Sequence, residues 1–297
     1  MTTVAIIGLG AMGGGMARSC LRAGLIVHGL DLDEARMTAF QNEGGAPGSA
    51  DRIIGDVDIV VTVVVNGAQT EAVLFGPNAI APRMKPGAVI VSCATLAPDL
   101  AKALAAKAAE LGVMYLDAPV SGGTLRAASG DLSFLASGPA DAFAKARPAL
   151  DAMAATVFEL GEEIGAGSAM KAINQMLVGV QIAAAAEAMT FGMTQGVDPS
   201  KTLEIISKCA GTSWAFENRG PHIVDGDYTP LSAVDIWLKD LGIVLDIAGK
   251  SKFSAPLTAA ALQQFVAASG SGLGREDDAA VAKVYARNAG LTLPGEA

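Results

Sequence analysis

The sequence predicts an α/β domain with a doubly wound parallel sheet, followed by an all-helical domain. Through the first half of the 297-residue chain, short runs rich in Val and Ile alternate with segments of helical length and apolar spacing, which is typical of βαβ units. Beyond residue 161 the strand-like runs stop, and long periodic segments rich in Ala, Leu and Met follow. We therefore expect one domain over residues 1–163 and a second over residues 164–297.

Each predicted element follows from its hydrophobic period. Six runs have the composition of buried strands, at residues 3–8, 25–31, 58–65, 88–92, 113–117 and 132–137. Helices are predicted at residues 12–23, 33–42 and 98–111, and in the second domain at residues 168–196 and 231–248. The acidic, glycine-rich segment GEEIGAG marks the boundary, because few contacts cross such segments.

Composition and charge restrict the class of protein. A hydrophobic content of 51% can fill real cores and excludes disorder as the main state. The formal net charge of -9 has the wrong sign for a phosphate backbone or an anionic membrane, so neither nucleic acid nor membrane is expected as a partner. With two histidines and no Cys-x-x-Cys pair in the sequence, no metal site is predicted.

The cysteines and the N-terminal segment favour a cytoplasmic location. Cys20, Cys93 and Cys209 are odd in number and widely spaced, which indicates a reducing compartment rather than a disulfide framework. The N-terminal segment has no basic region and reaches glycines before a signal-peptide core could form. The apolar stretch at residues 176–186 is interrupted by Gln181, which argues against a membrane-spanning helix.

A glycine motif follows the first predicted strand. The buried-strand run at residues 4–7 leads directly into the motif Gly8-Leu9-Gly10-Ala11-Met12-Gly13, and an amphipathic helix follows. Gly8 permits a tight turn, Gly10 lets the backbone approach a pyrophosphate, and Gly13 allows close packing of helix on strand. N–H groups at the helix N-terminus face the phosphates in such sites. The motif predicts a dinucleotide-binding Rossmann domain; the alternative is a loop that merely needs positive φ angles.

Asp31 indicates which dinucleotide is bound. It ends the second predicted strand 18 residues after Gly13, where a carboxylate can accept hydrogen bonds from ribose hydroxyls. A carboxylate there repels a 2'-phosphate, so NAD is predicted as the cofactor in preference to NADP. Arg36, the nearest cation, could reach such a phosphate only by folding back over Asp31. The alternative is that Asp31 only caps the helix at residues 33–42.

A glycine turn follows the predicted strand at residues 113–117. It contains Ser121, Gly122 and Gly123, whose hydroxyl and backbone N–H groups can bind a carboxylate, because turn glycines form anion-binding concavities. The alternative is a plain turn without a ligand. The sequence alone leaves both interpretations open.

Lys171 is the candidate for proton transfer. Ser168 is a plausible helix N-cap, which places Lys171 in the first helical turn with Asn174 and Gln175 on the same face. A cation in the first turn opposes the helix dipole, so we expect a lowered pKa that suits a proton donor and acceptor near neutrality. The alternative is a solvated surface lysine.

These residues together resemble the 3-hydroxyisobutyrate dehydrogenase, or β-hydroxyacid dehydrogenase, family over nearly the whole chain. The matching motifs are the glycine loop, D-x-P-V-S-G-G at residues 117–123, G-x-G-x-x-x-K-x-x-N at residues 165–174 and K-D-L at residues 239–241. The resemblance implies hydride transfer between nicotinamide C4 and a small hydroxy acid in an interdomain cleft, with Lys171 as general acid and base. It implies substrate contacts from Ser121, Gly122, Gly123 and Asn174 or Gln175, and dinucleotide contacts from Val64, Val65, Asn66, Thr95 and Lys239. The family's usual Leu-Pro and Ser-Thr pairs are replaced by Val64-Val65 and Ala94-Thr95, which removes any hydroxyl contact at residue 94.

Within this family, the segments at residues 65–66, 74–76, 210–219, 224–230 and 274–278 resemble the members that oxidise L-threonate. The resemblance implies NAD-dependent oxidation of L-threonate at C2 to the 2-oxo acid. Those members carry His where Asn174 stands, and an Asn-Gln pair also occurs in tartronate semialdehyde reductases. Reduction of tartronate semialdehyde and oxidation of 3-hydroxyisobutyrate therefore remain alternatives. The alternative outside enzymes is a dinucleotide-binding sensor, against which the intact Lys171, Ser121 and Lys239 argue.

Two expectations concern the second domain. Its apolar helical faces, with the Ala-rich run between Ile182 and Ala188, predict close packing across a two-fold interface and at least a dimer. The family resemblance implies a homodimer or a homotetramer. Trp214, Phe216 and Arg219 form either a pocket wall or a core aromatic pair with a surface charge.

Overall fold

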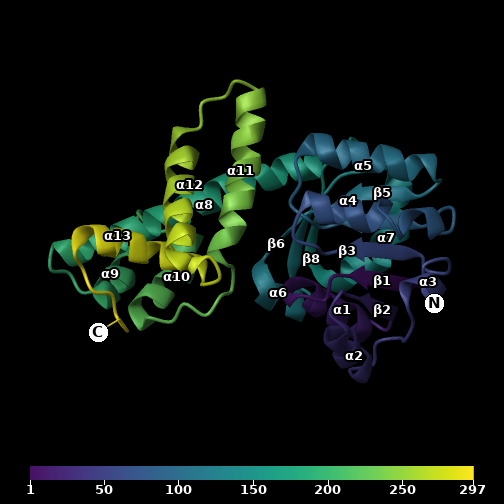
Figure 1. The fold of residues 1–297 in the computed structure, drawn as a ribbon, viewed down its shortest axis with the longest axis horizontal. Helices are drawn as coiled ribbons and strands as arrows, with labels where there is room; N and C mark the ends of the chain where they lie inside the picture. The colour runs from purple at the N-terminus through teal and green to yellow at the C-terminus, as the bar shows by residue number, and fades with distance from the viewer. Residues whose placement is uncertain (297) are drawn as a thin grey trace. The chain divides into compact units, whose positions relative to one another are not determined.

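The first unit contains a parallel sheet of five strands. The computed structural model describes residues 1–296 and divides into two compact units, Met1–Lys171 and a second one from Ala172 onward. In chain order the strands are β1 (Thr3–Ile7), β2 (Ile26–Leu30), β3 (Ile59–Thr62), β4 (Val89–Ser92) and β5 (Met114–Asp117). Their order in the sheet is β2-β1-β3-β4-β5 (Figure 1). The winding direction changes between β1 and β3, and ligands of such sheets bind at the carboxyl ends beside this point.

Both faces of this sheet are covered, which explains why β1, β3 and β4 have unbroken apolar runs. Successive residues of β1 belong to different cores: Val4 and Ile6 pack into one, and Ala5 and Ile7 into the other. The helices of this unit are α1 (Ala11–Arg22), α2 (Glu34–Asn42), α3 (Ala50–Ile53), α4 (Gly67–Phe75), η1 (Ala81–Arg83), α5 (Pro98–Glu110), α6 (Gly123–Ser129) and α7 (Ala140–Met153). The six predicted strands and the three predicted helices of this half are confirmed, with end shifts of a few residues.

One predicted strand lies in a different sheet from the one expected. The run at residues 132–137 forms β7 (Leu132–Ala136), which pairs antiparallel with β6 (Val120–Ser121) and parallel with β8 (Ala154–Glu159). Gly122 and Gly123, with φ of 133° and 72°, reverse the chain after β6. Only residues 122–131, which include the short helix α6, separate β6 from β7, and this is too short for a parallel crossover connection. The predicted parallel sheet therefore contains five of the six predicted strands, and the sixth belongs to the second sheet.

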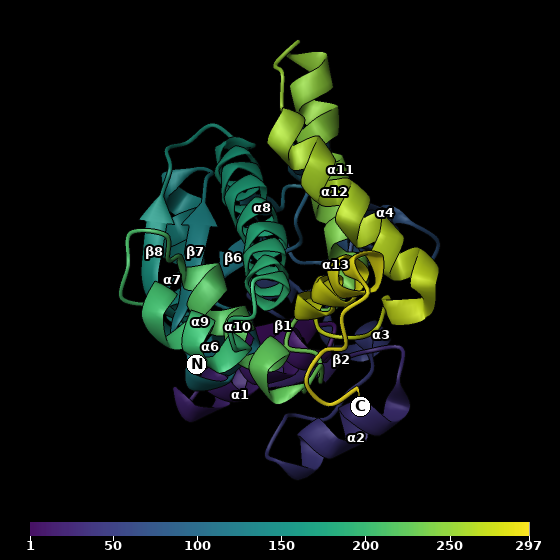
Figure 2. The same ribbon diagram turned by 90° about the vertical axis from the view of Figure 1, so that its left-hand side faces the viewer.

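The second unit is helical, as predicted. It contains most of α8 (Ala166–Thr194), followed by α9 (Pro199–Ile206), α10 (Trp214–Asp225), α11 (Val234–Lys250), α12 (Pro256–Ala268), η2 (Ser269–Leu273), η3 (Asp278–Ala280) and α13 (Val281–Ala289). Helices α11 and α12 lie side by side in Figures 1 and 2. The core of the unit is built around Ile182, Met189, Trp237 and Phe265, with the Trp237 and Phe265 rings stacked 5.6 Å apart.

Helix α8 has the length and hydropathy of a membrane-spanning segment. Among residues 1–296 it is the one helix that meets both criteria, and 39% of its most apolar window is buried. Core helices of globular proteins meet the same criteria. It has buried polar side chains near both ends, Ser168, Lys171 and Gln175 near its start and Thr190 near its end. We therefore interpret α8 as a core helix.

Candidate functional site

The glycine turn between β1 and α1 has two glycines that the fold requires and one that it does not. A Cβ at Gly8, where φ is 95°, would lie 2.4 Å from the Val63 carbonyl oxygen, and one at Gly13 would lie 1.8 Å from the Gly8 carbonyl oxygen. A Cβ at Gly10 would meet only a guanidinium nitrogen of Arg36, at 3.9 Å. The protein itself therefore leaves space in front of Gly10, where the first N–H groups of α1 lack intrahelical acceptors. This open, donor-lined space fits a dinucleotide pyrophosphate.

Asp31 connects the glycine turn to the end of β2. Its Oδ2 accepts a hydrogen bond from Leu9 N at 2.6 Å, and its Oδ1 accepts one from Asp33 N at 2.9 Å. Burial raises the pKa of the Asp31 carboxyl, but these bonds and the charge of Arg36 outweigh it and hold the pKa below its usual value. The N-cap of α2 is Asp33, whose carboxylate accepts from Ala35 N, so the alternative that Asp31 serves as that cap is wrong.

Arg36 folds back over Asp31. Its guanidinium lies 3.6 Å from Asp31 Oδ2 and 3.3 Å from Asp33 Oδ2, and its side chain is half exposed. This is the conformation that Arg36 needs in order to reach a 2'-phosphate. A cation next to the ribose site offsets part of the repulsion between Asp31 and a 2'-phosphate.

The predicted dinucleotide contacts of the first unit follow the carboxyl ends of β3 and β4. Val64 lies against the glycine turn, with its Cγ1 3.6 Å from a Cβ built at Gly8, and Val65 is exposed. Asn66 is the N-cap of α4, so its side-chain oxygen accepts from Gln69 N at 2.9 Å. Thr95 follows β4 and is buried. The topology thus places all of these residues at the edge of the sheet where ligands bind.

The turn at Ser121, Gly122 and Gly123 packs on the dinucleotide-binding helix through α6. A Cβ at Gly15 of α1 would lie 2.8 Å from Ala128 N of α6, and Ser19 Oγ donates to the Ala127 carbonyl oxygen at 3.1 Å. Positive φ at both turn glycines excludes a regular strand continuation and gives the half-exposed turn a left-handed backbone. The proposed substrate turn and the proposed cofactor helix therefore share one rigid contact.

Asp117, and not Ser168 as predicted, anchors the start of α8. The buried Asp117 carboxylate, at the end of β5, accepts hydrogen bonds from Ser168 Oγ at 2.7 Å, Ser168 N at 2.8 Å and Gly165 N at 3.1 Å. Burial raises the pKa of the Asp117 carboxyl even though these bonds lower it. Ser168 is the third residue of α8, so the N-cap assigned to it is wrong. Asp117 stands in the quoted D-x-P-V-S-G-G motif, which is the signal that could have identified it.

Lys171 is the sixth residue of α8 and lies in its second turn, not its first. The helix starts earlier than predicted, and the N–H groups at its start are satisfied by Asp117, which accepts from Gly165 N and Ser168 N, and by Ser137 Oγ, which accepts from Gly167 N. The Lys171 side chain is buried, with 8% of the residue exposed, so the alternative of a solvated surface lysine is wrong. The dipole argument weakens beyond the first turn, and the lowered pKa of Lys171 stays a prediction.

In the second unit, Asn174, Gln175 and Lys239 are joined by Asp240. Asn174 Nδ2 donates to Gln175 Oε1 at 2.8 Å, and Gln175 Nε2 donates to Asp240 Oδ2 at 2.5 Å. Lys239 Nζ lies 2.5 Å from Asp240 Oδ1. Asp240 is buried and was not among the residues predicted from the sequence, although it stands in the K-D-L motif. One carboxylate thus connects the predicted substrate amides with a predicted cofactor contact.

Arg219 belongs to the core of the second unit and not to its surface. It is buried and ion-paired with Asp278, whose other oxygen accepts from Trp237 Nε1 at 2.7 Å. Phe216 is buried in the same core, whereas Trp214 is half exposed with the guanidinium 5.9 Å from its ring. The surface-charge interpretation of Arg219 is therefore wrong, because its donors are turned inward.

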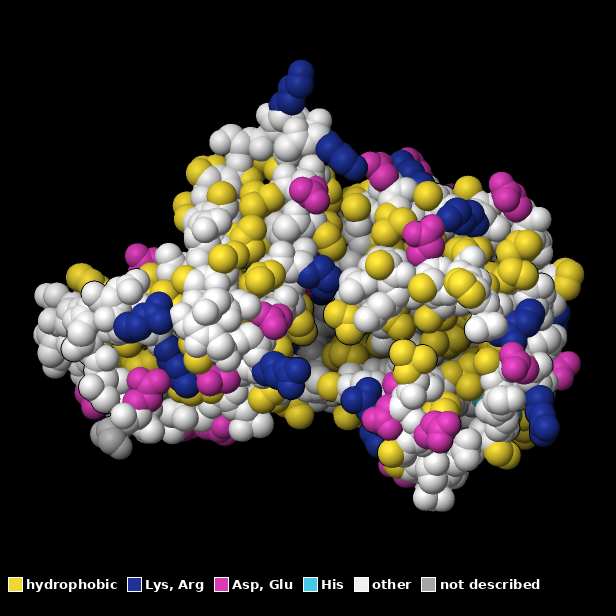
Figure 3. Space-filling model, viewed as in Figure 1, with side chains coloured by type: hydrophobic (Ala, Val, Ile, Leu, Met, Phe, Trp, Pro, Cys, Tyr) yellow, Lys and Arg dark blue, Asp and Glu magenta, His cyan; other side chains and the backbone are white. Residues whose placement is uncertain are grey.

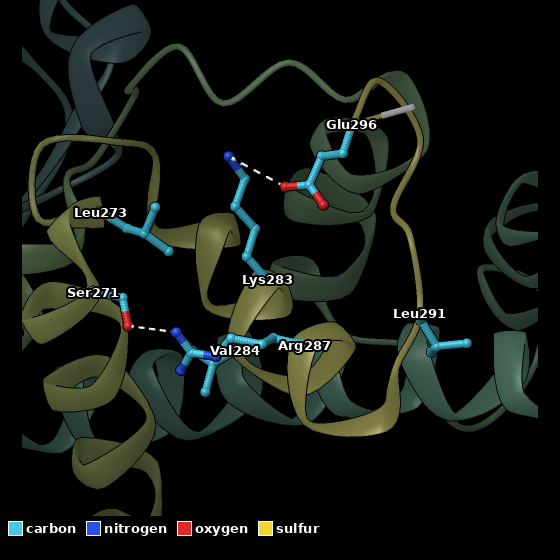
Figure 4. Close-up of a pocket in the computed structure, with 7 residues that line it drawn as sticks. All are labelled: Ser271, Leu273, Lys283, Val284, Arg287, Leu291 and Glu296. Carbon is cyan, nitrogen blue, oxygen red and sulfur yellow. Dashed lines mark hydrogen bonds and ion pairs between the residues drawn. The ribbon is translucent and has the colours of Figure 1, made fainter.

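A cavity of about 370 Å³ in the second unit contains none of the predicted site residues (Figure 4). Figure 4 shows Lys283 pointing toward Glu296 and Arg287 toward Ser271, and these cations are already paired, Lys283 with Glu276 at 2.7 Å. Within residues 1–296, no group of three or more His, Cys, Asp or Glu side chains is placed to hold a metal ion.

Comparisons with known proteins assign the family. Residues 3–161 match the NAD binding domain of 6-phosphogluconate dehydrogenase, and residues 165–285 match the NAD-binding domain of NADP-dependent 3-hydroxyisobutyrate dehydrogenase. The chain is 53% identical over 295 residues to an L-threonate dehydrogenase of Cupriavidus necator, covering 99% of this chain and 98% of the relative. It is 44% identical to an L-threonate dehydrogenase of Escherichia coli K12, covering 98% and 96%.

A solved structure supports the same assignment. A 3-hydroxyisobutyrate dehydrogenase from Salmonella typhimurium matches with a TM-score of 0.90 and 46% identity, covering 96% of this chain and 100% of that one. The open glycine turn, the buried lysine of α8 and these matches lead to one assignment. The chain belongs to the 3-hydroxyisobutyrate dehydrogenase family of NAD-dependent hydroxyacid dehydrogenases.

Proposed function

We propose that this enzyme oxidises L-threonate at C2 to the 2-oxo acid with NAD. The buried Lys171 is the observation that supports this type of reaction. It lies on α8, whose start is hydrogen-bonded to Asp117 at the end of β5, four residues before Ser121. The substrate is supported by the L-threonate dehydrogenases of several bacteria, which are 44–53% identical over nearly the full chain. In this proposal, residues 1–163 form the NAD-binding domain, and residues 164–297 form the domain for substrate binding and oligomerisation.

Each proposed residue has one task in this reaction. Ser121, Gly122 and Gly123 bind the substrate carboxylate through a hydroxyl and backbone N–H groups. Bound NAD supplies the hydride acceptor, nicotinamide C4. Lys171 accepts the proton of the C2 hydroxyl as the C2–H bond breaks and the C2 oxygen becomes a carbonyl. Asn174 binds a substrate hydroxyl, and the same groups run the reverse reduction by returning the proton.

The cofactor contacts are assigned by position. The N–H groups of the motif Gly8-Leu9-Gly10-Ala11-Met12-Gly13 hold the pyrophosphate, and Asp31 accepts from the ribose. Val64, Val65, Asn66 and Thr95 follow the adjacent strands, and Lys239 contributes a cation. Asn66 contacts the cofactor through its amide N–H₂ or its backbone, because its side-chain oxygen caps α4.

The experiment is a panel of C3 to C6 hydroxy acids with NADH formation measured at 340 nm. L-Threonate is expected to give the highest kcat/KM. A higher value with 3-hydroxyisobutyrate would favour the activity named for the Salmonella typhimurium structure. Turnover of tartronate semialdehyde with NADH and not of L-threonate would favour a reductase, and no turnover with NAD bound would favour a sensor.

We propose a homodimer or homotetramer formed through the exposed face of α8. Ile173, Leu177 and Phe191 are more than half exposed on this helix, with Ala184 and Ala188 exposed between them. The other alanines of the run are buried in the core of the second unit. Sedimentation is expected to give a dimer or larger, and Phe191→Glu to shift it toward monomer; a wild-type monomer at micromolar concentration would refute this.

We also propose a cytoplasmic enzyme with no nucleic-acid or membrane partner. The face in Figure 3 has acidic and basic side chains interspersed, without a continuous basic patch. The three cysteines are free, and two of them, Cys20 and Cys93, are buried. Burial raises the pKa of the Cys20 thiol to about 12, which makes it unreactive. Cell fractionation tests the location.

A further inference from the structure

Helices α8 and α11 approach each other closely at a glycine. A Cβ at Gly179 would lie 2.8 Å from Leu241 Cδ2 and 2.9 Å from the Trp237 ring, so only glycine permits this packing. Gln175 lies one turn before Gly179 on the same face of α8, and Asp240 precedes Leu241 on α11. The close packing therefore holds the Gln175 amide against the buried Asp240 carboxylate.

The carboxylate of Asp240 fixes which end of the Gln175 amide faces it. An ionised carboxylate only accepts hydrogen bonds, so Gln175 must present its Nε2, which lies 2.5 Å from Asp240 Oδ2. The opposite end of the same amide, Oε1, then faces Asn174 and accepts from its Nδ2 at 2.8 Å. Asp240 thus sets the direction of both hydrogen bonds, from Asn174 to Gln175 and from Gln175 to Asp240.

Asn174 is the last member of this chain. Its Nδ2 is committed to Gln175, so Oδ1 remains as an acceptor, and Asn174 is half-buried rather than enclosed. Gln175 is buried with both ends of its amide engaged. Of the two amides predicted to hold substrate, the geometry points to Asn174.

Lys239 balances the charge of Asp240 without competing with Gln175 for the same carboxylate oxygen. Lys239 Nζ lies 2.5 Å from Oδ1, the oxygen that Gln175 does not use, and this contact is an ion pair outside hydrogen-bond alignment. Lys239 is about one quarter exposed, so its remaining N–H groups can reach a ligand. The lysine therefore balances the charge of Asp240 from outside the pair of amides and does not set their direction.

We propose that Asp240 is a positioning residue that makes Asn174 present a carbonyl oxygen to a substrate hydroxyl, and that this direction gives the enzyme its preference for polyhydroxy acids. The inference rests on the proposed function, because it assigns the side chain that recognises the non-reacting hydroxyls of L-threonate. A hydroxyl donates to a carbonyl oxygen, whereas a hydrogen or methyl group in its place leaves that oxygen without a donor. Deoxy analogues should therefore be discriminated against.

The test compares L-threonate with 2,4-dihydroxybutanoate and 2,3-dihydroxybutanoate, which lack the C3 and the C4 hydroxyl. In the wild-type enzyme, kcat/KM for L-threonate should exceed that for one of the two analogues by roughly 10- to 100-fold. In Asp240→Asn neither end of the Gln175 amide is held in one direction, so Asn174 no longer presents a fixed acceptor, and the ratio should fall to within about threefold of that in Asn174→Ala. Gln175→Met removes the hydrogen bonds between Asp240 and Asn174 without changing Asp240, and it should lower the ratio in the same way.

Two comparisons separate positioning from simple loss of structure. Lys239→Met removes the ion pair but keeps the carboxylate, so it should raise the KM for NAD and leave the substrate ratio unchanged. In an Asn174→Ala background, Asp240→Asn should cause no further fall in the ratio, because the acceptor is already absent. Equal losses on all three substrates in Asp240→Asn and in Gln175→Met would overturn the proposal.

A substrate-free measurement keeps the proposal distinct from the proposed function. In ¹⁵N–¹H spectra, the side-chain amide protons of Gln175 should be protected from exchange in the wild type and lose that protection in Asp240→Asn. If the wild type does not oxidise L-threonate, the proposed function fails, and the ratio is measured with the preferred acid of the panel and its deoxy analogue. Unprotected Gln175 amide protons in the wild type would overturn the inference whatever the substrate is.

Discussion

Replacing Asp117 by Ala tests how firmly the first residues of α8 are held. The buried carboxylate accepts from Ser168 Oγ at 2.7 Å, Ser168 N at 2.8 Å and Gly165 N at 3.1 Å. Alanine leaves three buried donors without their acceptor, and each such group costs about 1–3 kcal/mol. Because water can enter the vacated space and satisfy part of them, we expect the free energy of unfolding to fall by about 3–5 kcal/mol.

The matched control is Asp117→Asn. The asparagine oxygen can still accept from Ser168 N and Gly165 N, and its amide can donate to Ser168 Oγ, so we expect a loss of only about 1–2 kcal/mol. Urea unfolding followed by circular dichroism measures both variants. The two tryptophans, Trp214 and Trp237, lie in the second unit, so their fluorescence follows that unit separately. An alanine variant within about 1 kcal/mol of wild type, or equal losses in both variants, would refute the anchoring role.

Three further predictions concern the first unit. The wild type should favour NAD over NADP by roughly 10- to 100-fold in kcat/KM, and Asp31→Ser should narrow this ratio; equal efficiency with NADP would refute the role of Asp31. Gly10→Ala should fold normally but bind NAD more weakly in calorimetry, and normal NAD affinity in this variant would contradict the pyrophosphate site. Gly13→Ala should fail to fold, because its Cβ would lie 1.8 Å from the Gly8 carbonyl oxygen. Burial raises the pKa of Asp58, but hydrogen bonds from Thr3 N and two lysines outweigh it and lower the pKa far below its usual value. The ionised form therefore stabilises the fold above about pH 4, and Asp58→Asn should lower the melting temperature at pH 7, with a gap that closes as pH falls below about 4. A gap independent of pH would exclude this charge effect.

The elements that carry strong periodicity could be predicted from the sequence. Strands β1, β3 and β4 are buried on both faces and therefore show unbroken apolar runs. Gly8 and Gly13 are required because a Cβ at either position would lie less than 3 Å from a backbone oxygen. Strand β8 (Ala154–Glu159) was not predicted, because its side chains are half-buried or exposed and show no such run. Its place in a second sheet depends on pairing with β7, which no local pattern reveals.

The parts of the site that depend on long-range partners could not be predicted. Serine is a preferred N-cap residue, which made Ser168 the candidate, but the acceptor at the start of α8 is Asp117, 51 residues away in the chain. The link between Gln175 and Asp240 spans 65 residues and depends on the close packing of α8 and α11 at Gly179. Local propensity identifies candidate side chains, whereas only the fold decides which of them contact each other.

The most direct test of the account is L-threonate-dependent NADH formation by wild type and Lys171→Ala, with NAD affinity measured on the same samples. We predict turnover by the wild type, unchanged NAD affinity in the variant, and a fall in kcat of about 10²- to 10⁴-fold, as expected for loss of a positioned acid–base group. Near-wild-type kcat in Lys171→Ala, or no NADH formation from L-threonate by the wild type, would contradict it.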